Sequence, residues 1–362
     1  MNQAVLAAPG RVLVEQAPDP TPEPGEVIVE VHACGICGTD RAIFRGEYPI
    51  NVPVVLGHEY SGVVVAVGEG VRSLSEGERV AVDPNVTCGA CPYCRRVFPH
   101  LCANLVGLGI HRPGGFAQYA AVPAQNVYPI PDILPFESAA FAEPLACCVQ
   151  GLNLAKVGLG DTVVILGGGP IGCMLLQLCR LAGAALIIVS EHRPARREIA
   201  LELGADLVVE DDEAVRAAVS ECTEDMGADV VFEAAGRAAA AELALALVRR
   251  GGTVMWFGAP PPEDDVTVSP FLVNDSEITI RGSYNNPFTH APALRLLSTG
   301  RVRVDLLATH SVSIDHVPEA LEGSGFRAAG KVLVMPQRPL ASSSTDTPDR
   351  TVGNSEHEVN RA

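Results

Sequence analysis

Residues 162–172 read T-V-V-I-L-G-G-G-P-I-G, and they indicate how the second half of the chain folds. The first five residues predict a buried strand, and the glycines that follow fit the pattern G-x-G-x-x-G. Gly167 permits a tight turn, Gly169 lets the backbone approach a pyrophosphate, and Gly172 lets a helix pack closely on the strand. A helix predicted over residues 171–182 would point its free amide groups at the phosphates. The stretch therefore predicts the phosphate-binding turn of a dinucleotide site.

Strand and helix patterns alternate from residue 161 onward. Short continuous apolar runs are separated by longer stretches rich in Ala, Leu and Glu. Strands of this kind are buried on both faces, so they predict a doubly wound parallel sheet with helices on either side. We assign residues 153–287 to this cofactor-binding domain. The predicted strands are residues 162–166, 185–189, 229–233, 253–258 and 278–281.

The first half of the chain has a different pattern. Short Val-rich segments separated by Gly and Pro predict an all-β unit of barrel or sandwich type. A helical spacing of apolar residues follows at 137–154, and the mixed elements after residue 288 are expected to rejoin this unit. The first domain is therefore predicted to comprise residues 1–152 and 288–336. Its predicted strands include residues 27–31, 61–67, 79–83 and 116–122.

The composition narrows the classes of function that the chain can have. A length of 362 residues with 48% apolar residues suits two domains. The net charge of -17 disfavours binding to nucleic acids and to anionic membranes, and no apolar run approaches the ~20 residues that span a bilayer. Residues 1–9 lack the basic and apolar regions of a secretory signal, so a cytoplasmic location is expected. Residues 337–362, rich in Ser, Thr, Pro and Asp, are predicted to be a disordered tail.

Four cysteines, Cys88, Cys91, Cys94 and Cys102, have the spacing C-x2-C-x2-C-x7-C. This spacing lets four thiolates converge on one tetrahedral ion, and Zn²⁺ prefers such a ligand set. Because a four-thiolate site has no open position for a substrate, this zinc is expected to be structural. A disulfide cluster and a set of unrelated buried thiols are the alternatives. The odd total of 11 cysteines and the expected reducing compartment favour the metal.

Further metal-ligand residues lie in the β-rich half and at its end. The motifs G-I-C-G-T-D, G-H-E and E-P-L-A contain Cys37, His58, Glu59 and Glu143. A catalytic zinc typically takes three protein ligands of these types and keeps one open position. Each residue also has an ordinary explanation, since a lone His is more often a core or loop residue and a lone Glu a surface charge. Asp40 could orient His58 or be an ordinary turn carboxylate.

An acidic residue is expected about 20 positions after the glycine turn, at the end of the second strand. Glu191 stands there, after I-I-V-S. A carboxylate can bind both hydroxyls of the adenosine ribose and repels a 2′-phosphate, so the sequence favours NAD over NADP. Three arginines nearby could instead meet a phosphate, or they could be ordinary surface charges at a helix start. They are Arg193, Arg196 and Arg197.

The motifs together resemble the zinc-containing medium-chain alcohol dehydrogenases. G-I-C-G-T-D, L-G-H-E, the cysteine quartet, E-P-L-A and G-G-G-P-I-G occur here in the order found in that family. The likeness covers nearly the whole chain before the predicted tail, and it is greatest to the branch acting on polyols, threonine and aminocyclitols. It implies an α/β protein with a β-rich GroES-like catalytic domain and a Rossmann cofactor domain. It also implies two zinc ions per chain, one catalytic and one structural.

The resemblance implies roles for individual residues. The ligands of the catalytic zinc would be Cys37, His58 and one or both of the carboxylates of Glu59 and Glu143. One carboxylate could coordinate directly and the other through water, or the two could exchange. The hydroxyl of Thr39 would contact the substrate oxygen and begin proton release. The positions lining the bound NAD would be Ile171, Glu191 and Arg196, beside the turn of Gly167, Gly169 and Gly172.

The implied reaction is the reversible oxidation of a secondary alcohol to a ketone, with hydride passing to the nicotinamide. The candidate substrates are polyols, amino alcohols, and cyclitols or aminocyclitols such as 2-deoxy-scyllo-inosamine; L-threonine or sorbitol/L-iditol oxidation is the alternative. A catalytically silent zinc-binding relative is the rival of another class. Relatives pair through the last strand, near residues 278–281, so a homodimer or homotetramer is expected. Asn285 and Asn286 follow that strand and could bind substrate hydroxyls or be turn residues.

Overall fold

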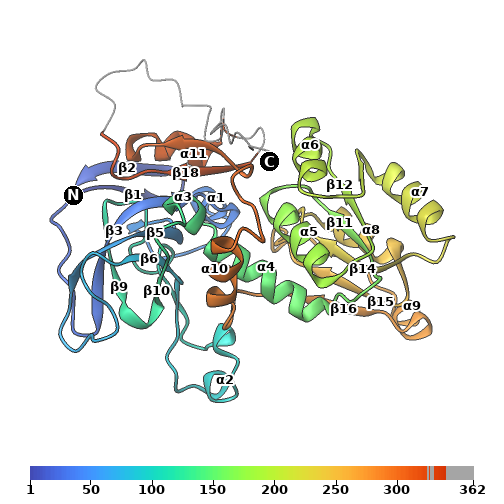
Figure 1. Cartoon of the computed structure of the whole chain (residues 1–362), viewed down its shortest axis with the longest axis horizontal. Coiled ribbons are helices and arrows are strands. Elements are labelled where there is room, and N and C mark those ends of the chain that lie inside the picture. Colours follow the sequence, from blue (N-terminus) through green and yellow to red (C-terminus); the bar gives the residue numbers. More distant parts are fainter. Residues whose placement is uncertain (324–325, 327–329, 340–362) are drawn as a thin grey trace, which may run out of the picture.

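The computed structural model of the protein describes residues 1–323, 326 and 330–339. A β-rich unit and a unit built on a parallel sheet lie side by side, with two packed helices, α4 (Ala142–Ala155) and α10 (His290–Ser298), between them (Figure 1). Most of the predicted tail, residues 340–362, lies outside the described residues. In the described part, no helix is both long enough and apolar enough to cross a bilayer.

The second unit contains a six-stranded sheet in the order β13-β12-β11-β14-β15-β16. All its neighbouring strands run parallel, and the order reverses between β11 and β14 as in dinucleotide-binding sheets. The prediction of a doubly wound α/β unit is therefore confirmed. Its strands are β11 (Thr162–Leu166), β12 (Leu186–Ser190), β13 (Leu207–Val209), β14 (Ala228–Glu233), β15 (Val248–Trp256) and β16 (Thr279–Gly282). Its helices are α5 (Pro170–Ala182), α6 (Pro194–Glu202), α7 (Asp212–Cys222), α8 (Ala238–Leu247) and α9 (Pro270–Ser276).

The central strand β11 shows why this sheet carries helices on both faces. Val163 and Ile165 belong to the apolar core shared with α4 and α5, whereas Val164 and Leu166 belong to the core shared with α7 and α8. Successive side chains of a strand point to opposite faces, so a continuous apolar run fills both cores.

The β-rich unit contains a seven-stranded sheet in the order β10-β6-β5-β3-β18-β17, with β9 also paired to β3. Its strands are β3 (Glu26–Gly35), β5 (Glu59–Val67), β6 (Arg79–Val82), β9 (Tyr119–Pro123), β10 (Val127–Pro129), β17 (Ala308–Val312) and β18 (Lys331–Val334). A smaller sheet joins β1 (Asn2–Ala8) to β2 (Arg11–Gln16) and β4 (Val54–Val55), and the helices are α1 (Gly38–Arg45), α3 (Phe136–Ala139) and α11 (Val317–Glu322). Because β18 pairs with β3, residues near both ends of the described chain lie in one sheet. Gln337, in the predicted tail, donates to the backbone oxygens of Val31 and Gln118.

A small lobe extends from the β-rich unit near α2 (Pro92–Arg95) (Figure 1). Its neck is the two-stranded pair of β7 (Asn85–Val86) and β8 (Val106–Gly107). The four cysteines of the predicted structural site lie in the loop that this neck closes.

The single helix predicted over residues 137–154 is wrong, because the structure has α3 and α4 there with a break at Ala140 and Phe141. Pro144 accounts for the break. In a continuous helix its ring would collide with the carbonyl group of residue 140. A proline in the first turn of a new helix has no such conflict, so the chain ends α3 and begins α4 at residue 142.

Candidate active site

Cys37, His58 and Glu59 lie together in the β-rich unit. Cys37 is the residue before α1, and His58 immediately precedes β5, whose first residue is Glu59. The antiparallel register of β3 and β5 pairs Gly35 with Glu59 and so brings the two segments together. One ligand atom from each of the three side chains lies within 4.8 Å of the others. A thiolate, an imidazole and a carboxylate at this separation fit the donor set of a zinc ion.

Asp40 is fully buried and holds two of these residues in place. Its Oδ2 accepts a hydrogen bond of 2.8 Å from the backbone N–H of Cys37, and its Oδ1 lies 3.2 Å from Nδ1 of His58. The second contact leaves Nε2 of His58 available as a metal ligand, which is the usual arrangement of a zinc-binding histidine. Burial lowers the pKa of His58, but Asp40 and Cys37 outweigh it and the pKa is raised overall. Asp40 therefore orients His58, as one of the two interpretations of the sequence proposed.

Lys331 is a residue of this site that the sequence did not reveal. Its ammonium group lies 2.6 Å from Oε1 and 2.5 Å from Oε2 of Glu59, and the two side chains are only 7% and 1% exposed. Burial alone would lower the pKa of Lys331, but the charge of Glu59 raises it overall, so the ammonium form is favoured. Lys331 is one of only two lysines in an arginine-rich chain, which is the one signal that could have directed attention to it.

Glu143 and Thr39 flank the cluster. Glu143 lies in the first turn of α4, is buried, and has its Oε1 3.4 Å from the sulfur of Cys147. Burial raises the pKa of Glu143 to about 7; His58 opposes the rise and Glu59 adds to it, so both lie near enough to act on it. Glu143 is not one of the three residues whose ligand atoms lie within 4.8 Å. The hydroxyl of Thr39 lies 3.7 Å from the sulfur of Cys37.

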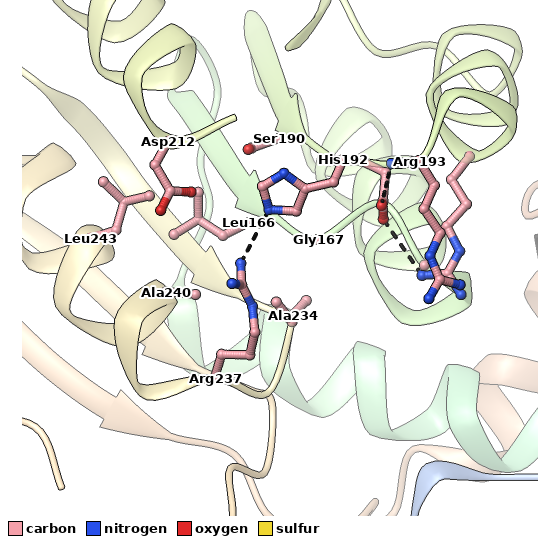
Figure 2. Close-up of a pocket in the computed structure, with 14 residues that line it drawn as sticks. Leu166, Gly167, Ser190, His192, Arg193, Asp212, Ala234, Arg237, Ala240 and Leu243 are labelled. Atoms are coloured by element: carbon pink, nitrogen blue, oxygen red, sulfur yellow. Dashed lines mark hydrogen bonds and ion pairs between the residues drawn. The ribbon is translucent and has the colours of Figure 1, made fainter. Parts of the chain in front are cut away.

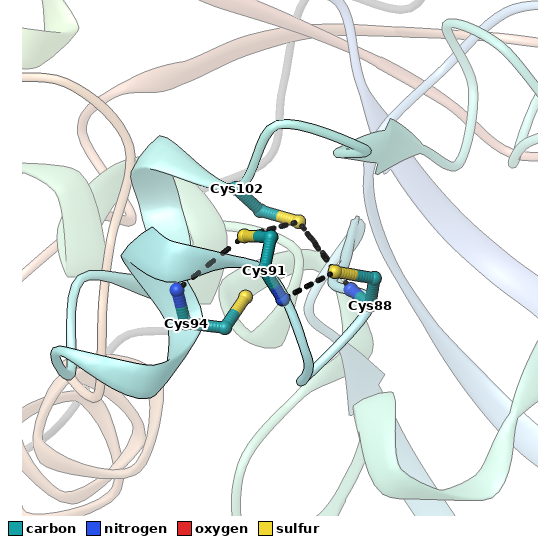
Figure 3. Close-up of side chains that lie close together, drawn as sticks. All are labelled: Cys88, Cys91, Cys94 and Cys102. Atoms are coloured by element: carbon teal, nitrogen blue, oxygen red, sulfur yellow. Dashed lines mark hydrogen bonds between the residues drawn. The ribbon is translucent and has the colours of Figure 1, made fainter.

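The four lobe cysteines converge at a second site (Figure 3). The sulfur of Cys102 lies 3.5 Å from that of Cys88 and 3.9 Å from that of Cys91. All four sulfur atoms lie within 4.8 Å of one another. Backbone N–H groups of Ala90 and Cys91 lower the pKa of Cys88 to about 6, which favours its thiolate. All 11 cysteines lie in the described part of the chain and are free thiols, so the disulfide alternative is wrong.

The glycine turn between β11 and α5 has the predicted form. Gly167 has a φ of 109°, which residues with a side chain rarely adopt. A Cβ atom at Gly172 would lie 1.8 Å from the carbonyl oxygen of Gly167, so only glycine fits where the helix approaches the strand. Gly169 is the residue before α5, whose N-terminus therefore faces the turn, and Ile171 lies in its first turn. This arrangement suits a pyrophosphate group.

A cavity of about 270 Å³ opens beside this turn (Figure 2). Glu191, at the end of β12, accepts hydrogen bonds from the backbone N–H groups of Gly168 at 3.1 Å and Arg193 at 2.9 Å. The guanidinium group of Arg196 lies 3.6 Å from Glu191. On the opposite wall the side chain of Arg237 contacts His192 at 3.4 Å. The cavity thus combines one buried carboxylate with several basic side chains.

Comparison with known proteins agrees with this arrangement. The model of the alcohol dehydrogenase GroES-like domain matches residues 23–132, and the model of the zinc-binding dehydrogenase family matches residues 170–298. A sorbitol dehydrogenase of Halalkalibacterium halodurans is 34% identical over 90% of this chain and 96% of its own length. An L-threonine 3-dehydrogenase of Pyrococcus abyssi is 35% identical over 87% and 92%.

Among solved structures, one described as a zinc-binding dehydrogenase from Sinorhizobium meliloti 1021 bound to NADP is 39% identical. It superposes with a TM-score of 0.89 over 92% of this chain and 99% of its own. The fold and the two clusters of ligand residues thus define a zinc- and NAD(P)-dependent oxidoreductase. The chain belongs to the zinc-containing medium-chain alcohol dehydrogenase family.

Proposed function

We propose that the enzyme oxidises a secondary hydroxyl group of a polyol or cyclitol to the ketone, reversibly, at the cluster of Cys37, His58 and Glu59. The observation that carries this proposal is that three different zinc-ligand types lie within 4.8 Å, with the Thr39 hydroxyl beside Cys37. A zinc ion bound there supplies Lewis-acid chemistry that lowers the pKa of a substrate hydroxyl. Thr39 accepts the proton that this hydroxyl loses and passes it toward solvent.

The two carboxylates have different partners, which suggests different roles. Lys331 contacts both oxygens of Glu59 and neutralises its charge, whereas Glu143 contacts only the weakly polar thiol of Cys147 among the hydrogen bonds of the described residues. We expect Glu59 to remain fixed beside Cys37 and His58. If Cys37, His58 and Glu59 hold a zinc ion, Glu143 would supply a further carboxylate beside it, either directly or through a water molecule.

The environment of Glu191 favours NAD over NADP. Its carboxylate lies in the adenosine cavity and is held by two backbone N–H groups, so it can accept hydrogen bonds from both ribose hydroxyls and would repel a 2′-phosphate. Arg193 and Arg196 line the same cavity, and a relative with 39% identity binds NADP. On the position of the Glu191 carboxylate we propose NAD as the preferred coenzyme, with Gly167, Gly169, Gly172, Ile171 and Arg196 lining its site.

The charges at the site favour an alcohol without a carboxylate over an amino acid. The carboxylate of a substrate such as threonine needs a cationic partner, and Lys331 is already engaged by Glu59. Cyclitols, aminocyclitols such as 2-deoxy-scyllo-inosamine, and open-chain sugar alcohols all present secondary hydroxyl groups without a carboxylate. We propose this group as the substrate class, with sorbitol- and threonine-type activities as the alternatives.

A screen of NAD⁺ reduction over polyols, cyclitols, aminocyclitols and amino alcohols tests the proposal. The variant Cys37→Ser should lose turnover and one zinc ion per chain while still binding NADH. Cys222→Ser is the matched control, because Cys222 is an exposed cysteine at the end of α7. Full alcohol oxidation by zinc-depleted Cys37→Ser protein, or preferential oxidation of L-threonine, would contradict the assignment.

Assembly and location stay predictions. β16 is the last strand of the parallel sheet, and Thr279 and Arg281 on it are exposed, so its outer edge is available for pairing with a second chain. We propose a homodimer or homotetramer in the cytoplasm, acting on a small-molecule alcohol. Light scattering on the purified protein measures the number of chains.

A further inference from the structure

Three asparagine side chains connect the cysteine lobe to the coenzyme-binding unit. Asn85 begins β7 in the neck of the lobe, and Asn285 and Asn286 lie in the loop of residues 283–289 between β16 and α10. Nδ2 of Asn85 donates to Oδ1 of Asn286 at 2.7 Å, and Nδ2 of Asn285 donates to Oδ1 of Asn85 at 3.1 Å. Asn286 is only 2% exposed. Both loop residues therefore share a hydrogen bond with Asn85, whereas Nδ2 of the buried Asn286 has no hydrogen-bond partner among the described residues.

Hydrogen bonds to Asp83 and Asn126 fix the position of Asn85 within the β-rich unit. The carboxylate of Asp83 accepts hydrogen bonds from the backbone N–H of Asn85 at 3.0 Å and from its Nδ2 at 2.9 Å. Asn126 donates to the backbone oxygens of Asp83 and Asn85, each at 2.9 Å. Nδ2 of Asn85 thus has two acceptors, which fixes the orientation of the amide and leaves its oxygen to accept from Asn285.

The loop that Asn85 contacts has an unfavourable backbone conformation. Phe288 has a φ of 61°, a left-handed conformation that is unfavourable for a bulky side chain, and Asn285 has a φ of 54°, which asparagine adopts more readily. Such conformations persist where the surrounding structure enforces them, often at ligand sites. The hydrogen bonds that Asn85 accepts from Asn285 and donates to Asn286 provide that constraint.

The position of the loop relates it to the coenzyme. It leaves the carboxyl end of β16, and ligands of doubly wound sheets bind beyond the carboxyl ends of the strands, across the point where the order reverses. The cavity of Figure 2 receives one half of the dinucleotide at the ends of β11, β12 and β14. The other half must extend toward β15 and β16, where this loop lies.

We propose that Asn85 is a positioning residue for the coenzyme. Through Asn285 and Asn286 it fixes the loop of residues 283–289 against the nicotinamide half of the dinucleotide. The neck of the cysteine lobe thereby strengthens coenzyme binding without contacting the coenzyme. This inference depends on the NAD(P) dependence of the family and not on the identity of the alcohol.

Binding of NADH and of ADP-ribose, which lacks the nicotinamide, tests the proposal on zinc-loaded protein. Asn85→Ala should raise the Kd for NADH about tenfold, equivalent to ~1.4 kcal/mol, and leave the Kd for ADP-ribose within about twofold. Asn286→Ala should have the same two effects. The double variant Asn85→Ala/Asn286→Ala should weaken NADH binding no more than the single variant with the larger effect, because both substitutions disrupt the same hydrogen-bond network. The matched control is Asn153→Ala, at an exposed position of α4.

A second variant keeps the test decisive if Asn85→Ala does not fold. Asn285→Gly removes the amide and also relieves the left-handed backbone, so the fold should be retained while the loop is released. It too should weaken NADH binding and spare ADP-ribose. Two results would overturn the proposal. One is an unchanged Kd for NADH in the folded variants. The other is an equal rise in the Kd values for NADH and ADP-ribose, which is what a purely structural role of Asn85 would produce.

Discussion

Replacing Lys331 by Met tests whether the buried ion pair with Glu59 supports the active site. Both side chains are at least nine-tenths buried, so removing the ammonium group leaves the Glu59 carboxylate in a poorly solvated environment. Breaking a buried pair in this way costs about 3–5 kcal/mol. We expect a loss near the lower end of that range, about 3 kcal/mol of unfolding free energy, because a zinc ion next to Glu59 replaces part of the lost charge.

The assay is urea denaturation of zinc-loaded protein, followed by circular dichroism. Lys156→Met is the matched control, since Lys156 is the only other lysine of the chain and is exposed at the end of α4. The double variant Glu59→Gln/Lys331→Met should recover more than half of the loss, because the uncompensated charge is then absent. If Lys331→Met loses no more stability than Lys156→Met, the ion pair does not stabilise the site and our interpretation is refuted.

The remaining predictions concern the other sites. Cys94→Ser should lower the melting temperature and the zinc content from about two ions per chain to about one; unchanged stability measured by calorimetry would contradict a structural site. Glu191→Ala should raise the ratio of kcat/KM for NADP to that for NAD by at least about tenfold, because the repulsion of a 2′-phosphate is removed; an unchanged ratio would show that Glu191 does not select the coenzyme. Burial lowers the pKa of His290 to about 3, and neither ring nitrogen has a hydrogen-bond partner among the described residues. The unfolded chain therefore binds a proton that the folded chain does not, and folding stability should fall by up to about 1.4 kcal/mol per pH unit as the pH drops from ~6.5 toward 3. His290→Phe should lack this component in denaturation measured at several pH values, and parallel pH profiles would contradict it.

The parts of the molecule that the sequence predicted are those whose chemistry lies within a short segment. The turn from Gly167 to Gly172 and the cysteine quartet each occupy fewer than twenty residues, so spacing alone indicates which atoms meet. Other contacts join residues that are far apart in the sequence. Lys331 and Glu59 are separated by 272 positions, and Asn85 and Asn286 by 201 positions. These contacts depend on which strands pair and in which register, and no local pattern contains that information.

The sequence also misplaced one local feature, for a related reason. The apolar periodicity over residues 137–154 continues through the break between α3 and α4, because both helices present apolar residues to one core. Periodicity reports which face is buried and not whether the backbone hydrogen bonds are continuous. The steric effect of Pro144 was the better indicator of where the helix begins.

Gly35 shows how the register of the sheet explains a residue that the motif alone does not. It is the first glycine of G-I-C-G-T-D, and its backbone is extended, so no turn requires a glycine there. In the sheet it pairs with Glu59 on one side and with Leu333 on the other. A Cβ atom at this position would lie 2.2 Å from Oε2 of Glu59 and 3.1 Å from Cδ of Lys331. A side chain at position 35 and the Glu59–Lys331 pair therefore exclude each other, because the buried ion pair occupies the space above the α-carbon of this glycine.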